Sequence, residues 1–84
     1  YQTVNVGAYQ SINVGANQST KIGDNYVVTA GKNISLSAGD SISLTVGKSS
    51  LVMKSDGTIL LNGKTIDVVG SSHIQLDSDR IDLN

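Results

Sequence analysis

The chain has 84 residues, with six basic and seven acidic side chains, a formal net charge of −1, three tyrosines and no Phe, Trp, Pro or Cys. This charge balance excludes an electrostatic footprint for nucleic acid, and the lack of Cys excludes disulfides and thiolate metal sites. A chain of this size with so few large side chains is a poor basis for a compact core, so the core has to come from stacked coils or from several chains.

Glycine recurs every eight residues through the first half of the chain. The six corner glycines are Gly7, Gly15, Gly23, Gly31, Gly39 and Gly47. A repeat of eight residues is too short for a globular domain, so each unit is predicted to be one strand and one turn of an elongated β-structure. Glycine tolerates positive φ, and we therefore expect each of these residues to form a corner between strands. Residues 1–49 are predicted to be regular octads.

Apolar and polar residues alternate within each unit, which places the apolar set on one face of the strands. In the fifth unit, Ile34, Leu36 and Ala38 share a face, while the serines between them occupy the other. The first inward position is Gln in the three opening units, at residues 2, 10 and 18. Two interpretations of these glutamines stay open: a polar, hydrated interior, or corners that face solvent.

From residue 50 the glycine spacing is lost, but the alternation continues. Paired apolar positions recur at intervals of seven or eight residues, beginning with Leu51 and Met53. The corners change to Asp56-Gly57 and Asn62-Gly63, which are strong turn dipeptides. Residues 50–84 are therefore predicted to form irregular repeats of the same architecture, which end in a C-terminal tip.

The alternation predicts one set of interior residues for the whole chain and a few aliphatic exceptions on the outward register. The predicted interior consists of Val4, Val6, Ile12, Val14, Ile22, Val28, Ile34, Leu36, Ile42, Leu44, Val46, Leu51, Met53, Ile59, Leu61, Ile66, Val68, Ile74 and Leu76. The exceptions are Val27, Val52, Leu60 and Val69, which we interpret as exposed or half-covered strand residues. The rest of the outward register is mainly Ser, Thr, Asn and scattered charge.

The alternation is compatible with two arrangements. Three octads could form one coil of a single-chain solenoid, or three chains could wind around a common axis. A lone solenoid of this length would need atypical capping repeats, and the N-terminal units show none, which favours shared winding. The chain begins in the middle of a strand pattern without an initiating Met, and we expect it to be a fragment of a longer protein.

The run VNVGAYQSINVGANQSTKIG resembles the VxVGxxxx octad repeat of the triple-stranded β-helix in the central spike of contractile-tailed, T-even-like phages. It is equally similar to the homologous VgrG spikes of type VI secretion, and the resemblance extends over residues 1–84. Thr20, Ala30 and Ala38 depart mildly from the pattern. The resemblance implies an all-β fold, an intertwined triple-stranded β-helix in which three parallel chains form a homotrimeric prism. Each strand would then bond to two neighbours from other chains.

The same resemblance implies a structural role. The chain would be a membrane-piercing spike segment of a contractile injection apparatus, either in the tail baseplate of a virion or in a secreted spike. It would make transient contact with the target cell envelope. Ile81, Leu83 and Asn84 would form the platform for a conical PAAR-repeat tip protein. An alternative from another class is the β-solenoid stalk of a bacterial surface adhesin that binds glycan or protein, but the octads lack the stripe of exposed aromatic residues that recognition requires.

The sequence contains no motif for catalysis or for metal binding. The chain has no Glu, and no nucleophile, base and orienting group can be assembled, so no enzymatic activity is predicted for this segment. Asp77, Asp79 and Asp82 are interpreted as a solvated acidic collar, and His73 is expected to face outward, away from the axis where a shared metal would lie.

The predicted axis of the assembly could hold a guest. Beside the small side chains of Ala30 and Ala38, an apolar tube could accommodate an adventitious fatty acid or ion. The alternative is complete packing by the interior side chains. No cofactor is required in either case.

Overall fold

The computed structural model describes residues 3–83. The chain divides into two units, Tyr1–Asn33 and Ile34–Asn84. Residues 3–83 contain no helix, and consequently no helix that is long and apolar enough to cross a bilayer. The regular elements are β1 (Ser41–Val46), β2 (Ser49–Lys54) and β3 (Ile59–Asn62). The predicted all-β class is confirmed.

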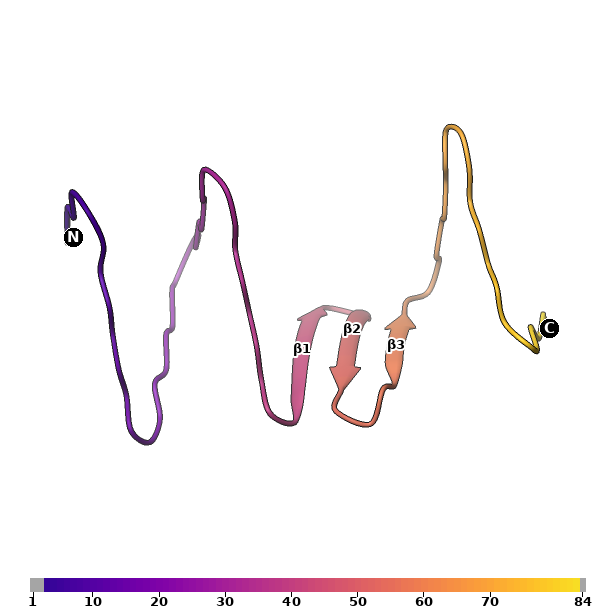
Figure 1. The fold of residues 1–84 in the computed structure, drawn as a ribbon, viewed down its shortest axis with the longest axis horizontal. Coiled ribbons are helices and arrows are strands. Elements are labelled where there is room, and N and C mark those ends of the chain that lie inside the picture. The colour runs from indigo at the N-terminus through magenta and orange to yellow at the C-terminus, as the bar shows by residue number, and fades with distance from the viewer. Residues whose placement is uncertain (1–2, 84) are drawn as a thin grey trace. The chain divides into compact units, whose positions relative to one another are not determined.

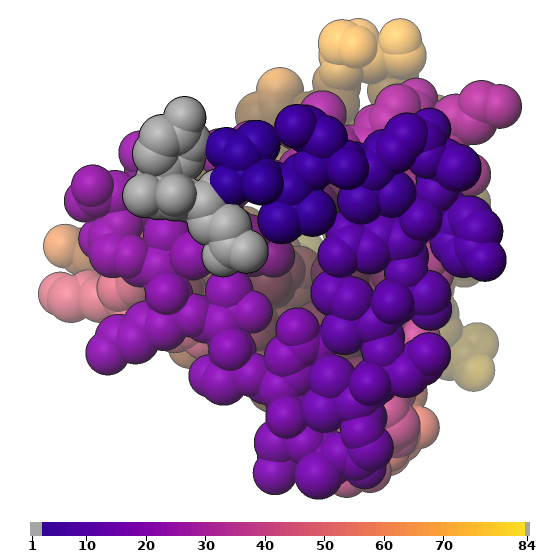
Figure 2. Space-filling model, turned by 90° about the vertical axis from the view of Figure 1, so that its left-hand side faces the viewer, coloured from indigo at the N-terminus to yellow at the C-terminus, as the bar shows by residue number. Residues whose placement is uncertain are grey.

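In the first unit the chain runs in extended segments that are separated by bends at the expected corners. Bends fall at residues 7–8, 15–16, 23–24 and 31–32, and further bends or turns follow at 39–40 and 47–48 in the second unit (Figure 1). The predicted period of eight is therefore confirmed. Residues 3–33 carry no paired strand, because none of these segments has a hydrogen-bonded neighbour among the described residues. Figure 2 shows this unit, in indigo to purple, with its side chains standing at the surface.

The second unit contains an antiparallel meander in the order β1-β2-β3. In the register, Leu44 faces Leu51 and Leu51 faces Leu61. Because directly opposed residues project to the same side of a sheet, this register gathers the apolar residues of all three strands on one face. The predicted alternation is thus confirmed for residues 41–62 as a shared sheet face, and the position of that face in an interior stays a prediction.

The turn between β1 and β2 explains why these strands pair within one chain. Gly47 has a φ of +52°, and the two-residue loop 47–48 has positive φ only at its first position, which is the pattern of a type II′ hairpin turn. Such a turn reverses the chain, so that β2 pairs with β1 of the same chain. The expectation that each strand bonds to strands of other chains is therefore wrong for β2, whose two edges are paired by β1 and β3.

The turn between β2 and β3 is closed by hydrogen bonds around Asp56. The Gly57 N–H donates to the Lys54 carbonyl at 3.1 Å, and the Lys54 N–H donates to the Thr58 carbonyl at 2.9 Å. The Asp56 carboxylate accepts the Thr58 N–H at 3.0 Å. Gly57 has a φ of +93°, which only glycine adopts readily. The dipeptide forms the turn that the sequence predicts.

Positive φ does not explain the other corner glycines. Among the six, Gly47 alone has positive φ. A Cβ placed on any of the six would have no heavy atom within 4 Å among the described residues, apart from its two neighbours in the sequence. The expectation that glycine is needed for positive φ is thus wrong at the other five corners, where the backbone bends with no residue in the left-handed region.

A first prediction follows for Gly47→Ala. An L residue in the left-handed region costs about 1–2 kcal/mol, so we expect the free energy of unfolding to fall by that amount. Denaturant unfolding monitored by circular dichroism measures it. Gly39→Ala is the matched control, because Gly39 lacks positive φ and has open space at its Cβ position. Equal losses in both variants would contradict this interpretation of Gly47.

Candidate functional site: an uncovered apolar sheet face

The apolar side of the β1-β2-β3 sheet is the most prominent surface of the second unit. Two cross-strand rows form it, and we call it the apolar face. The rows are Leu44, Leu51 and Leu61, and Ile42, Met53 and Ile59. The meander fixes their positions, since each row spans all three strands at one level of the register. Directly opposed apolar side chains stabilise the sheet by about 0.2–1 kcal/mol per pair.

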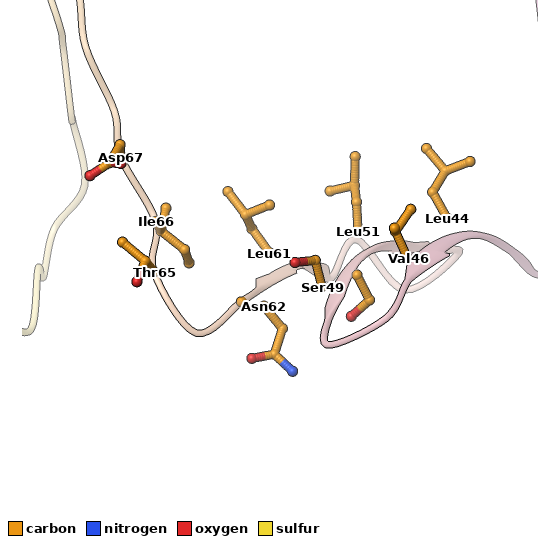
Figure 3. Close-up of a pocket in the computed structure, with 11 residues that line it drawn as sticks. Leu44, Val46, Ser49, Leu51, Leu61, Asn62, Thr65, Ile66 and Asp67 are labelled. Atoms are coloured by element: carbon orange, nitrogen blue, oxygen red, sulfur yellow. The ribbon is translucent and has the colours of Figure 1, made fainter.

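The segment after β3 extends this face into a hollow. Leu44, Val46, Leu51, Leu61 and Ile66 supply its apolar lining, and Figure 3 shows the leucines of the three strands projecting to the same side of the sheet. The polar lining residues come from the start of β2, the end of β3 and the segment that follows it, and they are Ser49, Ser50, Asn62, Thr65 and Asp67. At about 340 Å³ and open to solvent, the hollow is at the lower limit of small-molecule pockets. Its form suits inserted side chains of a partner better than an enclosed ligand.

None of residues 3–83 covers the apolar face. Residues 3–83 contain no buried side chain at all, and Leu44 and Leu61 are 58% and 61% exposed. The chain presents 8984 Å² of accessible surface, whereas a compact protein of 8.7 kDa presents about 4,700 Å². The difference far exceeds the roughly 800 Å² that each partner contributes to a standard interface. The free energy of hydrophobic burial is therefore not realised within one chain.

The opposite face of the same sheet is predominantly polar. Its register positions carry Ser43, Thr45, Ser50, Lys54 and Asn62 together with one apolar pair. That pair is Val52 against Leu60, two of the residues that the sequence places on the outward register. They lie on the face opposite to the apolar one, and their pairing across the strands accounts for them without a partner.

Two sheet edges remain open. In the order β1-β2-β3, only β2 has a neighbour on both sides within the described chain. An open edge presents unpaired N–H and C=O groups and is a template for another strand. The sheet is therefore incomplete in two directions: across its apolar face and along its edges.

Asp56 fixes the β2–β3 turn electrostatically. Hydrogen bonding from the Thr58 side chain, and then from its backbone N–H, lowers the pKa of Asp56 below its ordinary value of 3.8. A lowered folded-state pKa means that the ionised carboxylate favours the folded turn. This contribution is complete above about pH 3.8 and is lost as the pH falls through the folded-state pKa.

We accordingly expect the Thr58 amide resonance to shift on acidification, with a midpoint below 3.8. Titration by two-dimensional NMR measures it. Asp56→Asn is the matched control, because an amide oxygen can still accept the Thr58 N–H but does not titrate in this range. A midpoint above 3.8, or the same titration in Asp56→Asn, would contradict the assignment.

The C-terminal tip holds the residues expected to form the platform. Ile81 and Leu83 are 50% and 91% exposed, and Asn84 lies outside the described residues. The Arg80 Nε lies 3.1 Å from the Asp82 carboxylate, and both side chains are largely exposed. An ion pair at such a site contributes little to stability. The role of Ile81 and Leu83 as a platform stays a prediction.

The candidate metal residues remain apart in the structure. Within residues 3–83, no three His, Cys, Asp or Glu side chains are grouped so that they could hold an ion. His73 is exposed, and Asp82 is engaged by Arg80. The interpretation of the acidic collar as solvated surface stays a prediction.

The structure brings together one part of the predicted interior set. The residues of β1, β2, β3 and Ile66 share the apolar face and its hollow. The remaining predicted interior residues, which include Val4, Ile12 and Leu76, are also exposed, and their meeting on a common axis stays a prediction. The hydrogen bonds of the β2–β3 turn were not predicted in detail, although the dipeptide Asp56-Gly57 marked the position.

Comparison with known proteins gives no further guide to function. No protein-family model matches the chain, and no curated protein matches it. Function has to be argued from the apolar face, the open edges and the repeating bends.

Proposed function

We propose that the chain is a segment of a rigid, homotrimeric β-spike that pierces a membrane as part of a contractile injection apparatus. In this proposal three copies form an intertwined triple-stranded β-helix, a prism with its apolar faces turned inward. The observation that carries the proposal is the uncovered apolar face. Because residues 3–83 bury no side chain, the chain needs partners, and further copies offer surfaces of the same chemistry.

The repeating geometry supports a prism. Bends recur every eight residues from residue 7 to residue 47, so successive extended segments have equal length. Equal segments and equal corners let symmetric copies follow one another around an axis. Residues 41–62 would fit differently: each copy would supply a complete three-stranded sheet as one face of the prism, joined to its neighbours through the open edges of β1 and β3.

Mechanical function follows from closed pairing. A prism without lateral edges satisfies the backbone hydrogen bonds of its strands, which is the condition for backbone to enter lipid. The polar face of the meander would form the outside and offers few anchors to a membrane. Such a rod would resist unravelling under load, because a copy cannot leave without losing its ladders.

The end of the rod would bear a partner. Ile81 and Leu83 from three copies would form an apolar platform, and a PAAR-repeat-type tip protein is the proposed occupant. The segment would act at the target cell envelope, from a virion or a secreted spike. We propose no catalytic role or required cofactor for this segment, and a fatty acid or ion on the axis is an optional guest.

Electrophoresis in detergent tests the proposal. Interwound chains dissociate slowly, so we expect a trimer band in samples that are not heated and a single-chain band after boiling. Chemical cross-linking before denaturation gives the stoichiometry independently. If unheated samples run as single chains and cross-linking yields no trimer, the spike proposal fails and a single-chain solenoid, as in the adhesin alternative, is favoured.

A further inference from the structure

Asn62 differs from the other internal asparagines of this chain in the residue that follows it. The chain has seven asparagines, and only Asn62 is followed by glycine. The other internal asparagines precede Val, Gln, Tyr or Ile, whose side chains crowd the following backbone nitrogen, whereas glycine leaves that nitrogen open. We propose that Asn62 is a site of spontaneous deamidation and that this chemistry is confined to the end of β3.

The reaction needs only the chain and water. The Gly63 backbone nitrogen attacks Cγ of Asn62, and a C–N bond forms as the Cγ–Nδ2 bond breaks. The amide nitrogen leaves as ammonia and carries away the proton that Gly63 has lost. Water then opens the resulting five-membered imide at either carbonyl, giving aspartate or isoaspartate at position 62. The net change is the replacement of an amide by a carboxylic acid, without oxidation or reduction.

The position of Asn62 in the fold permits this reaction. Asn62 is the last residue of β3, a four-residue strand at the edge of the sheet, and Gly63 lies outside the strand. Strand ends open with little cost in free energy, which gives the backbone the rotation that ring closure requires. The Asn62 side chain is exposed and projects away from the apolar face, opposite to Leu61 (Figure 3). Solvent can therefore reach both the amide and the imide.

The second glycine dipeptide is an internal contrast. In Asp56-Gly57 the nitrogen that would attack is engaged, because the Gly57 N–H donates to the Lys54 carbonyl at 3.1 Å. The Asp56 carboxylate is held by the Thr58 N–H at 3.0 Å. An ionised carboxylate is also a poor electrophile. The fold therefore protects Asp56 from the equivalent rearrangement and leaves Asn62 unprotected.

The product would change the polar face of the sheet at the end of β3. Asn62 adjoins the hollow, but its side chain projects away from the apolar face. Deamidation would therefore place a new negative charge on the opposite, polar face, where Asn62 faces Ser50. Isoaspartate would also insert a methylene into the backbone where the chain leaves β3. Deamidation at Asn62 is a property of the single chain and does not depend on the trimer, so either proposal can fail without the other.

Peptide mapping by mass spectrometry tests the proposal. The purified protein is incubated in mildly alkaline buffer and digested, and isoaspartate is labelled enzymatically. We expect aspartate and isoaspartate to accumulate at position 62, while Asn13, Asn33 and Asp56 stay unmodified. In Gly63→Ala the rate should fall by about tenfold or more, because the added methyl crowds the attacking nitrogen. A Cβ at residue 63 meets no atom closer than 3.5 Å, so this variant keeps the fold.

Three results would overturn the proposal. The first is an intact Asn62 after an incubation in which the same protein, unfolded in denaturant, is modified there. The second is modification of Asn13 or Asn33 at the rate seen for Asn62. The third is an unchanged rate in Gly63→Ala.

Discussion

Leu51→Asp is expected to convert the assembled protein into single chains. Leu51 occupies the central strand, and on the apolar face it lies between Leu44 and Leu61. In the proposed trimer this side chain is covered by other copies. Loss of a covered leucine costs about 2–5 kcal/mol, and an unpaired carboxylate in an apolar interior adds a desolvation penalty. Both costs recur in all three copies.

Val52→Asp is the matched control for this change. Val52 is the next residue of the same strand but belongs to the opposite, polar face, where it contacts Leu60. The control should lose only that cross-strand pair, worth about 0.2–1 kcal/mol, and should remain assembled. Sedimentation velocity distinguishes the two variants. Trimers in Leu51→Asp, or dissociation of both variants to the same extent, would show that the apolar face is not the interface.

Gly70→Ala is expected to destabilise the segment that follows the meander. A Cβ on Gly70 would lie 2.7 Å from the His73 carbonyl oxygen and 2.6 Å from Cγ1 of Ile74. The isoleucine side chain could rotate away, but the carbonyl belongs to the backbone. Relief therefore requires the corner to open, and overpacking of this kind costs about 1–3 kcal/mol. The midpoint of denaturant unfolding should fall accordingly.

Gly63→Ala provides the comparison in the same unit. Its Cβ would lie 3.5 Å from the Thr65 carbonyl oxygen, which is an ordinary contact, and Gly63 has no positive φ. We expect this substitution to change the free energy of unfolding by less than about 0.5 kcal/mol. Equal midpoints for Gly70→Ala and the unmodified protein would mean that the close approach at residue 70 is not essential to the fold.

The sequence predicted the features that depend on local chemistry. Alternation placed Ile42, Leu44 and Leu51 on one face, and the register confirms it. The glycine period predicted the bends, and Asp56-Gly57 predicted a turn. These features follow from the two-residue period of strands and from turn chemistry, which a single sequence contains.

Strand pairing could not be predicted in the same way. Alternation places the same residues inward whether a strand pairs with its own chain or with another, so the in-chain neighbours of β2 were missed. The two-residue loop at Gly47 and Lys48 was the available signal, since glycine at the first position favours a hairpin. That signal was obscured because Gly47 has the same spacing as the five corner glycines that do not form hairpins.

The candidate site was only partly accessible to sequence reasoning. Its members on β1, β2 and β3 were predicted as interior residues, but the hollow beside Ile66 depends on how the chain leaves β3. The dipeptide Asn62-Gly63 marked a corner there, but the bend itself falls at residues 64–65, and the dipeptide does not predict where the following residues lie. The tip residues Ile81 and Leu83 are exposed, so their proposed role depends on the assembly.

The molar mass in solution is the most direct test of whether several copies share one interior. Light scattering coupled to size-exclusion chromatography should give three times the chain mass of 8.7 kDa, unchanged on dilution, if three apolar faces meet inside a prism. A mass equal to one chain over the same concentration range would contradict it, because the apolar face would then be stable in contact with water.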